Sequence, residues 1–139
     1  MNFSLIFIAL SMLSNPVYTV PTNIAKTYSL QNGNITAKLF INATTGSENA
    51  AITLLKLKPE AKIATHTHKN SDEILFIRSG SLQMTIGNNT FTAGSEQVIF
   101  IPKNIPHSTM VVGDKTVEVI QVYAKPGPEQ RFTKGKLLQ

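Results

Sequence analysis

The sequence of 139 residues predicts an all-β fold built as a single domain. From Ile35 onward, short β-branched or aromatic runs alternate with turns containing Gly, Asn or Pro. No stretch keeps the residue spacing of an amphipathic helix. The length suits one hydrophobic core and is too short for two comfortable domains. We therefore expect one domain over residues 21–139, with a barrel or sandwich core at about 50–124.

The first twenty residues differ from the rest of the chain. Residues 3–13 form an apolar run, and the first basic residue is Lys26. The run is too short to span a bilayer as a helix, but it suits the hydrophobic region of a secretory signal peptide over residues 1–20. We expect cleavage between Ser14 and Thr22, no membrane span in the mature chain, and a secreted or periplasmic protein. The alternative is an apolar first strand or an uncleaved anchor.

Nine runs have the β-branched and aromatic character of strands. Turn sequences that tolerate a positive φ separate them, such as Ser79-Gly80 and Gly113-Asp114-Lys115, so consecutive strands should pair as hairpins. The expected strands are 35–41, 50–58, 63–68, 73–78, 81–86, 89–92, 97–101, 107–112 and 116–124.

Two of these strands differ in how their apolar residues are spaced. Residues 81–86 alternate between apolar and polar side chains, which predicts one solvent-exposed face. Residues 98–101 are apolar on both faces, which predicts a strand buried between two layers or beneath a neighbouring subunit.

Composition excludes several classes of function. The chain has no cysteine, which rules out thiolate metal sites and cysteine nucleophiles. Its net charge is +5, but the lysines are scattered rather than gathered with aromatic residues into a stripe. We therefore expect no nucleic-acid partner.

The three histidines are the main candidates for chemistry. His66 and His68 lie one residue apart in a β-type segment, so both imidazoles should face the same way. Two such imidazoles can bind one ion, although an isolated His-x-His pair is more often ordinary strand surface. Asp72 and Glu73 follow directly, and strand parity alone does not choose between these carboxylates.

This segment resembles the first motif of the cupin superfamily, G-x5-H-x-H-x(3,4)-E-x6-G. Here the motif reads Glu60, His66, His68, Glu73 and Gly80 at the family's spacing, with Glu60 in place of the leading Gly. The resemblance selects the second carboxylate of the Asp-Glu pair as the family's metal ligand.

A second cupin motif, G-x5-P-x-G-x2-H-x3-N, is matched more loosely. Gly94 precedes Pro102 by two residues more than in the family, which implies a bulge or longer turn. Asn104 stands where the family has Gly, and Asn tolerates the left-handed conformation of such a turn. His107 keeps the family's spacing from Pro102, whereas Val111 replaces the final Asn.

The resemblance implies a double-stranded β-helix, or jelly-roll, of the RmlC-like cupin type. It further implies that His66, His68, Glu73 and His107 converge inside the barrel on one divalent transition-metal ion. Three neutral imidazoles and one carboxylate leave coordination positions open, as a catalytic site requires. Manganese, iron, nickel, copper and zinc all fit these ligands.

Other polar residues have weaker assignments. Gln121 and Tyr123 lie near the end of the last long strand and are candidates for a substrate pocket. Arg78 has the opposite parity to Glu73 and should face away from the ion. Arg131 and Phe132 should anchor the C-terminal tail rather than bind substrate. No residue stands out as a dedicated general base.

The resemblance implies a metal-dependent enzyme of dioxygenase, oxidase, isomerase or lyase type, acting on a small oxygen-rich molecule, and the expected signal peptide implies that it is exported. The alternative is a metal-dependent binding module for a small carboxylate or carbohydrate. We also expect a homodimer, since short cupins commonly pair through outer strands.

Overall fold

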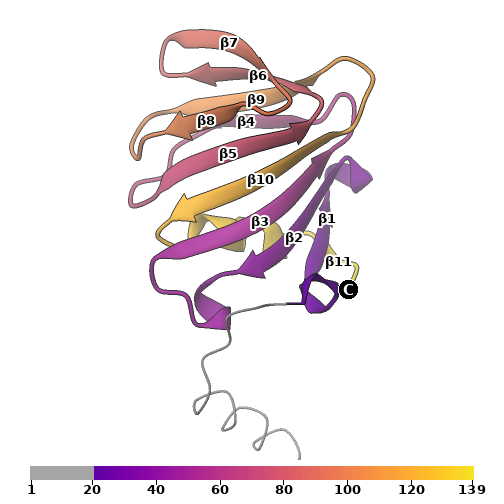
Figure 1. Cartoon of the computed structure of the whole chain (residues 1–139), viewed down its shortest axis with the longest axis vertical. Helices are drawn as coiled ribbons and strands as arrows, with labels where there is room; N and C mark the ends of the chain where they lie inside the picture. The colour runs from indigo at the N-terminus through magenta and orange to yellow at the C-terminus, as the bar shows by residue number, and fades with distance from the viewer. Residues whose placement is uncertain (1–20) are drawn as a thin grey trace, which may run out of the picture.

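The computed structural model describes residues 21–139, so the expected signal peptide lies outside the described residues. The described part folds as two antiparallel sheets that face each other (Figure 1). Its strands are β1 (Thr27–Leu30), β2 (Ile35–Ile41), β3 (Ala50–Leu57), β4 (Lys62–His66), β5 (Asp72–Ser79), β6 (Ser81–Ile86), β7 (Asn89–Gly94), β8 (Val98–Ile101), β9 (His107–Val112), β10 (Val117–Ala124) and β11 (Lys136–Leu137).

The larger sheet has the strand order β11-β1-β2-β3-β10-β5-β8, and the smaller sheet has the order β4-β9-β6-β7. Consecutive strands in the chain repeatedly fall in opposite sheets, as β4 and β5 do, or β9 and β10. This alternation produces the jelly-roll arrangement that the sequence predicts.

The core lies between the two sheets because the long strands alternate strictly in burial. In β3, β5 and β10 every second side chain is buried, and the intervening side chains lie on the outer face. The inner positions of the two sheets carry large apolar residues, which include Leu55, Leu57, Leu75, Ile77, Leu82, Met84, Ile101, Val117 and Val119. The inner face of the larger sheet therefore forms one wall of the barrel interior.

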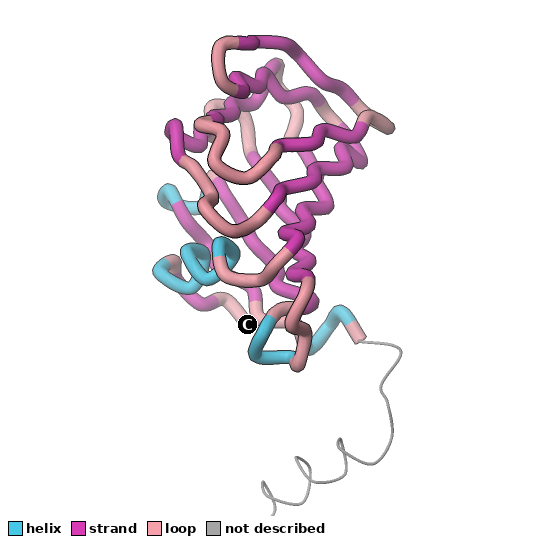
Figure 2. Tube along the Cα trace, turned by 90° about the vertical axis from the view of Figure 1, so that its left-hand side faces the viewer, coloured by secondary structure: helices cyan, strands magenta, loops and turns pink. Residues whose placement is uncertain are grey.

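All nine expected strands are present within a few residues of their predicted ends. The sequence reasoning missed two short strands, β1 and β11, which pair with each other at the edge of the larger sheet. It also missed the 3-10 segments η1 (Thr22–Ile24), η2 (Gln31–Gly33), η3 (Ala43–Thr45) and η4 (Pro128–Lys134). These segments gather in the lower half of the molecule in Figure 2, away from the β6–β7 hairpin at the top.

The burial of β6 and β8 tests two sequence predictions: one exposed face for residues 81–86 and two buried faces for residues 98–101. β6 has the expected buried and exposed faces around Leu82 and Met84. In β8, Ile99 and Ile101 point into the core, while Val98 is 64% exposed and Phe100 is 57% exposed. Of the two alternatives predicted for this strand, burial between two layers is wrong for the single chain, because β8 is an edge strand of the seven-stranded sheet; burial beneath a neighbouring subunit stays a prediction.

Three turns show how the chain accommodates its departures from the cupin motifs. Glu60 and Asn104 occupy positions where the motifs have Gly, and both adopt left-handed conformations, with φ of 70° and 65°. The longer segment after Gly94 forms a turn in which Glu96 is left-handed and the Gln97 side chain accepts the Gly94 N–H at 2.6 Å.

The C-terminal tail closes one side of the barrel through η4. Gly127 precedes it with a φ of 144°, a conformation that favours glycine. The fully buried Glu129 carboxylate accepts the Gly127 N–H at 2.6 Å, and Phe132 packs in the core with 3% exposure. Within residues 21–139 no helix has the length and apolar character needed to cross a membrane.

Candidate metal centre

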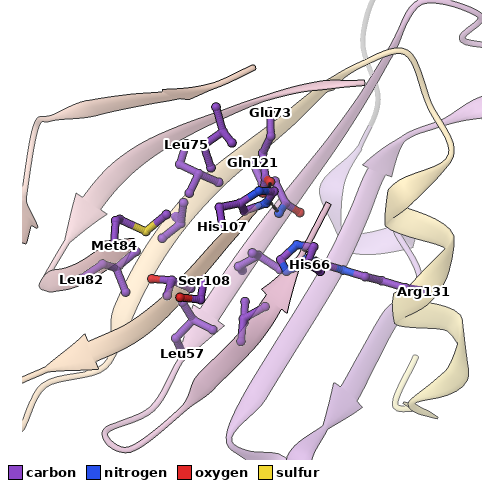
Figure 3. A pocket seen from close by; sticks show the side chains of 15 residues that line it. Leu57, His66, Glu73, Leu75, Leu82, Met84, His107, Ser108, Gln121 and Arg131 are labelled. Carbon is purple, nitrogen blue, oxygen red and sulfur yellow. Dashed lines mark hydrogen bonds and ion pairs between the residues drawn. The ribbon is translucent and has the colours of Figure 1, made fainter. Parts of the chain in front are cut away.

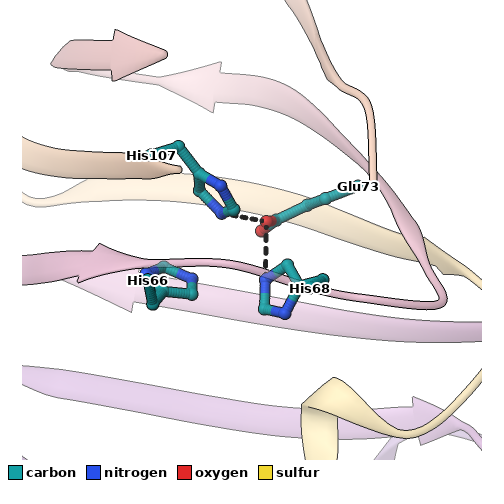
Figure 4. Close-up of side chains that lie close together, drawn as sticks. All are labelled: His66, His68, Glu73 and His107. Atoms are coloured by element: carbon teal, nitrogen blue, oxygen red, sulfur yellow. Dashed lines mark hydrogen bonds and ion pairs between the residues drawn. The ribbon is translucent and has the colours of Figure 1, made fainter. Parts of the chain in front are cut away.

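The four residues predicted to share an ion come together inside the barrel. His66 ends β4, His68 lies in the β4–β5 loop, Glu73 is the second residue of β5, and His107 begins β9. Their potential ligand atoms all lie within 4.8 Å of one another (Figure 4). Both sheets contribute, since β4 and β9 belong to the smaller sheet and β5 to the larger.

The loop that joins β4 to β5 is held by the loop that precedes β9. The His68 carbonyl accepts the Asn104 N–H at 2.8 Å, and the Asp72 carboxylate accepts the Lys103 N–H at 2.8 Å. Asp72 is therefore engaged outside the cluster, whereas Glu73, with the opposite parity, points into it. The motif spacing had selected Glu73 rather than Asp72, whereas strand parity alone did not distinguish them.

Glu73 is the centre of the contacts within the cluster. Its Oε2 lies 3.0 Å from His107 Nε2 and 3.2 Å from His68 Nε2, and its Oε1 accepts a hydrogen bond from Gln121 Nε2 at 2.5 Å. Burial raises the pKa of Glu73, but the contacts from His107, His68 and Gln121 outweigh burial and hold this pKa well below its ordinary value. The carboxylate is therefore ionised inside the barrel, where its exposure is 3%.

Both ring nitrogens of His107 face acceptors. Nδ1 lies 2.8 Å from the Ile105 carbonyl, and Nε2 faces Glu73. Burial lowers the pKa of His107, but the bonds to Glu73 and Ile105 raise it above its ordinary value overall. The two contacts fix the ring with Nε2 toward the Glu73 carboxylate.

His66 is held differently from His107. Its Nδ1 donates to the Ala64 carbonyl at 2.8 Å, and its Nε2 accepts from the Arg131 guanidinium at 2.8 Å. Burial, together with the nearby Arg131 charge, lowers the pKa of His66 to about 4 despite the backbone bond, which raises it. His66 is therefore a neutral imidazole whose Nε2 carries the free lone pair.

The donor set fits a divalent transition-metal ion. His68 Nε2 is buried without a hydrogen-bond partner among the described residues, although the Glu73 carboxylate lies beside it. Buried polar atoms are rarely left unpaired, and a shared cation would satisfy this nitrogen and the carboxylate together. The backbone bonds at Nδ1 of His66 and His107 direct Nε2 of both rings inward, as metal-bound imidazoles require.

A small cavity of about 20 Å³ adjoins the cluster (Figure 3). His66, Glu73, His107, Gln121 and Arg131 lie at its polar end. Ser108 and Thr109 of β9 also reach it, and the rest of the wall is apolar, from Leu55, Leu57, Ile63, Leu75, Leu82, Met84, Ile101 and Val119.

The two residues expected at a substrate pocket take different positions. Gln121 lines the cavity and donates to Glu73. Tyr123 is fully buried, and its ring packs edge-on against His68 with centroids 5.0 Å apart. Its hydroxyl has no hydrogen-bond partner among the described residues, and burial raises its pKa well above the ordinary value.

Arg131 and Phe132, both expected to anchor the tail, make different contacts. Phe132 does anchor η4 in the core, but Arg131 projects from the same turn into the cavity and reaches His66 (Figure 3). No local motif marks this role, because it depends on how the tail folds back over the barrel. Arg78 lies on the outer surface as expected, 3.6 Å from Glu118.

Comparison with known proteins identifies the family. A model of the cupin domain matches residues 53–123, which is more than half of the chain and contains all four clustered residues. The chain belongs to the cupin family. The jelly-roll fold expected from the two motifs is therefore confirmed.

Solved structures of other cupins share this fold at low sequence identity. A predicted oxalate decarboxylase from Thermotoga maritima matches with a TM-score of 0.68 and 17% identity, covering 77% of this chain and 98% of that chain. An RmlC-like cupin from Shewanella frigidimarina matches with a TM-score of 0.68 and 10% identity, covering 83% and 96%. The Bacillus subtilis oxalate decarboxylase, which has Mn(II) centres, matches with a TM-score of 0.70 and 21% identity, covering 84% and 32%.

One curated protein is a distant relative of this chain. The polyketide synthase CurC from Streptomyces cyaneus is 26% identical over 82 residues, which cover 59% of this chain and 53% of that protein. The match thus spans about half the length of the relative.

Proposed function

We propose that this cupin binds one divalent transition-metal ion through His66, His68, Glu73 and His107. The observation that carries the proposal is the convergence of three imidazoles on the ionised Glu73 carboxylate inside the barrel, with all four potential ligand atoms within 4.8 Å of one another. Manganese, iron, nickel, copper and zinc fit this donor set. The Mn(II) centres of the Bacillus subtilis oxalate decarboxylase support manganese as the first metal to test.

We further propose that the site is enzymatic and acts on a small oxygen-rich molecule. A bound ion supplies Lewis-acid or redox chemistry, which suits a dioxygenase, oxidase, isomerase or lyase. The chain contributes the rest: backbone bonds fix the His66 and His107 rings, Gln121 orients the Glu73 carboxylate, and the apolar cavity wall limits water. The oxalate decarboxylases among its structural neighbours support a lyase reaction on a small acid.

Two measurements on the purified protein test this function. Elemental analysis should find about one transition-metal ion per chain in the wild type and little in His66→Ala or Glu73→Gln. Incubation of the metal-loaded protein with small organic acids and sugars, followed by mass spectrometry, should reveal a product. Binding without product would indicate a binding module instead, and a wild type that takes up no metal would contradict the proposal.

We propose that the chain acts outside the cytoplasm, with residues 1–20 removed as a signal peptide. The apolar run at residues 3–13 supports this location. N-terminal sequencing of the protein recovered from medium or periplasm should give a start between residues 14 and 22. A mature protein that begins at residue 1 inside the cytoplasm would contradict it.

We also propose that the protein is a homodimer. The outer positions of β3, β10, β5 and β8 form two apolar rows across the sheet, Ile52, Val122, Ile74 and Phe100 in one and Leu54, Ile120, Phe76 and Val98 in the other. The charged pair Lys56 and Glu118 borders these rows, at a separation of 3.1 Å. A second copy fits this face, because twofold packing would set the same apolar rows against each other.

The size of the protein in solution tests the dimer. Sedimentation equilibrium should give a dimer for the wild type and a monomer for Phe100→Asp, since this substitution places a charge in the apolar face. Gln83→Asp, at an exposed position of the other sheet, is the matched control and should stay dimeric. A monomeric wild type at high concentration would contradict the proposal.

A further inference from the structure

The cavity beside the histidine cluster is nearly filled by its own wall. Its volume of about 20 Å³ is close to what a single water molecule needs. A substrate larger than water therefore requires part of the wall to move. Every residue of the wall except Arg131 lies on a strand of the two sheets, whereas Arg131 belongs to η4 in the tail. Its side chain reaches from η4 to the cluster (Figure 3).

A second hollow lies against the same arginine. It has a volume of about 230 Å³ and is lined by Leu30, Gln31, Ile35, Ile63, Ala64, Arg131 and Phe132. Gln31 and Ala64 are exposed, so this outer hollow reaches the surface. Ile63 and Arg131 line both the outer hollow and the cavity. The Arg131 side chain is therefore part of the partition between the surface and the histidine cluster.

The contacts of Arg131 allow its guanidinium to move while η4 stays in place. The guanidinium lies 4.8 Å from the centroid of the Phe132 ring and makes one hydrogen bond among the described residues, to His66 Nε2 at 2.8 Å. Within residues 21–139, no carboxylate lies within 4.0 Å of it. η4 itself is held by the buried side chains of Glu129 and Phe132. The bond to His66 is thus the main polar contact that keeps the guanidinium at the cavity.

That hydrogen bond and metal coordination exclude each other. The Ala64 carbonyl can only accept and the guanidinium can only donate, so the His66 ring carries its proton on Nδ1 and its free lone pair on Nε2. A metal ligand must offer the same lone pair. Arg131 therefore leaves His66 when this ring coordinates an ion, and repulsion between the two positive charges favours the departure.

We infer that Arg131 is a gate that metal binding opens. In the metal-free protein the arginine closes the cavity at His66. Once His66 coordinates an ion, the side chain moves away and joins the cavity to the outer hollow, which becomes the route of the substrate to the site. This inference rests on the proposed metal site, and it explains how a cavity of one water molecule accepts a substrate of several heavy atoms. The ion must bind before the substrate.

The mobility of the Arg131 side chain tests the gate without any substitution. The chain has two arginines, Arg78 and Arg131, so protein labelled with ¹⁵N-arginine gives two Nε–H signals. On addition of diamagnetic Zn²⁺, ¹⁵N relaxation should show Arg131 changing from a restrained side chain to a mobile one. Arg78 lies on the outer surface and is the internal control, whose relaxation should stay the same. An Arg131 that stays restrained in the Zn²⁺-bound protein would overturn the gate.

Removal of the guanidinium should strengthen metal binding. Competition with a fluorescent chelator should show that Arg131→Met binds Zn²⁺ at least about threefold more tightly than the wild type, because the His66 lone pair no longer has to exchange partners. Lys134→Met removes the same charge from an exposed position of η4 and should bind Zn²⁺ like the wild type. Thermal unfolding of both variants checks the fold. Equal or weaker Zn²⁺ binding by Arg131→Met would overturn the competition at His66.

Entry of azide into the Co²⁺-bound protein tests the route. Azide is larger than water, and its coordination changes the visible absorption of Co²⁺. Ala64→Phe places a ring in the outer hollow and should slow azide binding at least about tenfold in stopped-flow measurements. Gln83→Phe, at an exposed position of β6, is the matched control and should bind azide at the wild-type rate. Equal rates in Ala64→Phe and the wild type would overturn the route.

Failure of the metal site gives a different result from failure of the gate. A wild type that takes up neither Zn²⁺ nor Co²⁺ would overturn the proposed function and this inference with it. Uptake of the ion with an Arg131 side chain that stays restrained would overturn the gate and leave the metal site intact.

Discussion

The two ends of the histidine cluster are held by different kinds of contact. At the inner end, His107 is 3% exposed and its Nε2 lies 3.0 Å from the Glu73 carboxylate. At the outer end, His66 is only partly buried and bonds to Arg131, a side chain carried by a short turn of the tail. The inner end is thus fixed by the contact between Glu73 of β5 and His107 of β9. The outer end depends on the Arg131–His66 hydrogen bond, which a metal ion on His66 Nε2 would replace.

This difference indicates a division of labour within the site. A buried carboxylate that pairs with imidazoles keeps its charge and geometry before any ion arrives, so the inner end is preorganised. The outer end faces the cavity, where an incoming ligand would bind. Variants at the two ends should therefore differ in what they change.

Replacing Glu73 should have the largest effect. Glu73→Gln removes the charge at the inner end, and metal affinity should fall at least about hundredfold, which corresponds to about 2.7 kcal/mol. Equilibrium dialysis with Mn²⁺ or Zn²⁺ measures it. Asp72→Asn is the matched control, because this carboxylate bonds to Lys103 N–H outside the cluster, and it should change metal affinity by less than about threefold. Equal losses in both variants would contradict the assignment of Glu73.

The metal-free stability of two alanine variants compares the ends directly. His107→Ala leaves the Glu73 carboxylate without its main partner in the core, so the free energy of unfolding should fall by about 2 kcal/mol. His66→Ala should cost less than about 1 kcal/mol, since it removes a partly exposed ring. Urea unfolding in the presence of a chelator measures both. A larger loss of unfolding free energy in His66→Ala than in His107→Ala would contradict the view that the inner end of the cluster is the preorganised one.

Gln121 should support the inner end without being a ligand. Gln121→Leu removes the hydrogen bond to Glu73 Oε1, so metal affinity should fall about tenfold, as for other partners of metal ligands. Gln83→Leu, on the exposed face of β6, provides a control of the same chemistry. Unchanged affinity in Gln121→Leu would show that the carboxylate is oriented by its other contacts.

The pH dependence of the metal-free protein gives the smallest effect. The pKa of Glu73 is lowered, so its contribution to stability is present above its ordinary pKa and is lost as pH falls through the lowered value. The pKa of His107 is raised, so its contribution is present below its ordinary pKa and is lost as pH rises through the raised value. The stability difference between wild type and Glu73→Gln should therefore peak near pH 5–6, at about 1 kcal/mol. A difference that does not vary between pH 4 and 9 would contradict this ion pair.

The fold was predictable because it depends on local patterns. Alternation in β3, β5 and β10 and the Gly and Asn turns define strands without reference to distant residues. β1 was missed because Thr27–Leu30 is short and becomes a strand through pairing with the C-terminal β11. Such long-range pairing leaves no signature in either segment.

Part of the candidate site was also predictable from local sequence spacing. His66, His68 and Glu73 lie within one short segment, and their spacing places them together. His107 rests on a motif with two additional residues, yet it joins the cluster, because those residues lie in the turn around Glu96. Arg131 escaped prediction because its place in the cavity depends on the path of the tail, which no local spacing encodes.

The location of a bound ion tests the central claim most directly. Crystals of the Co²⁺-loaded protein, with data collected at the cobalt absorption edge, would show the ion as an anomalous difference peak. We predict one strong peak per chain within about 2.3 Å of the ligand atoms of His66, His68, Glu73 and His107. A peak elsewhere, or a cluster that keeps the Glu73–His107 contact with no peak beside it, would contradict the account.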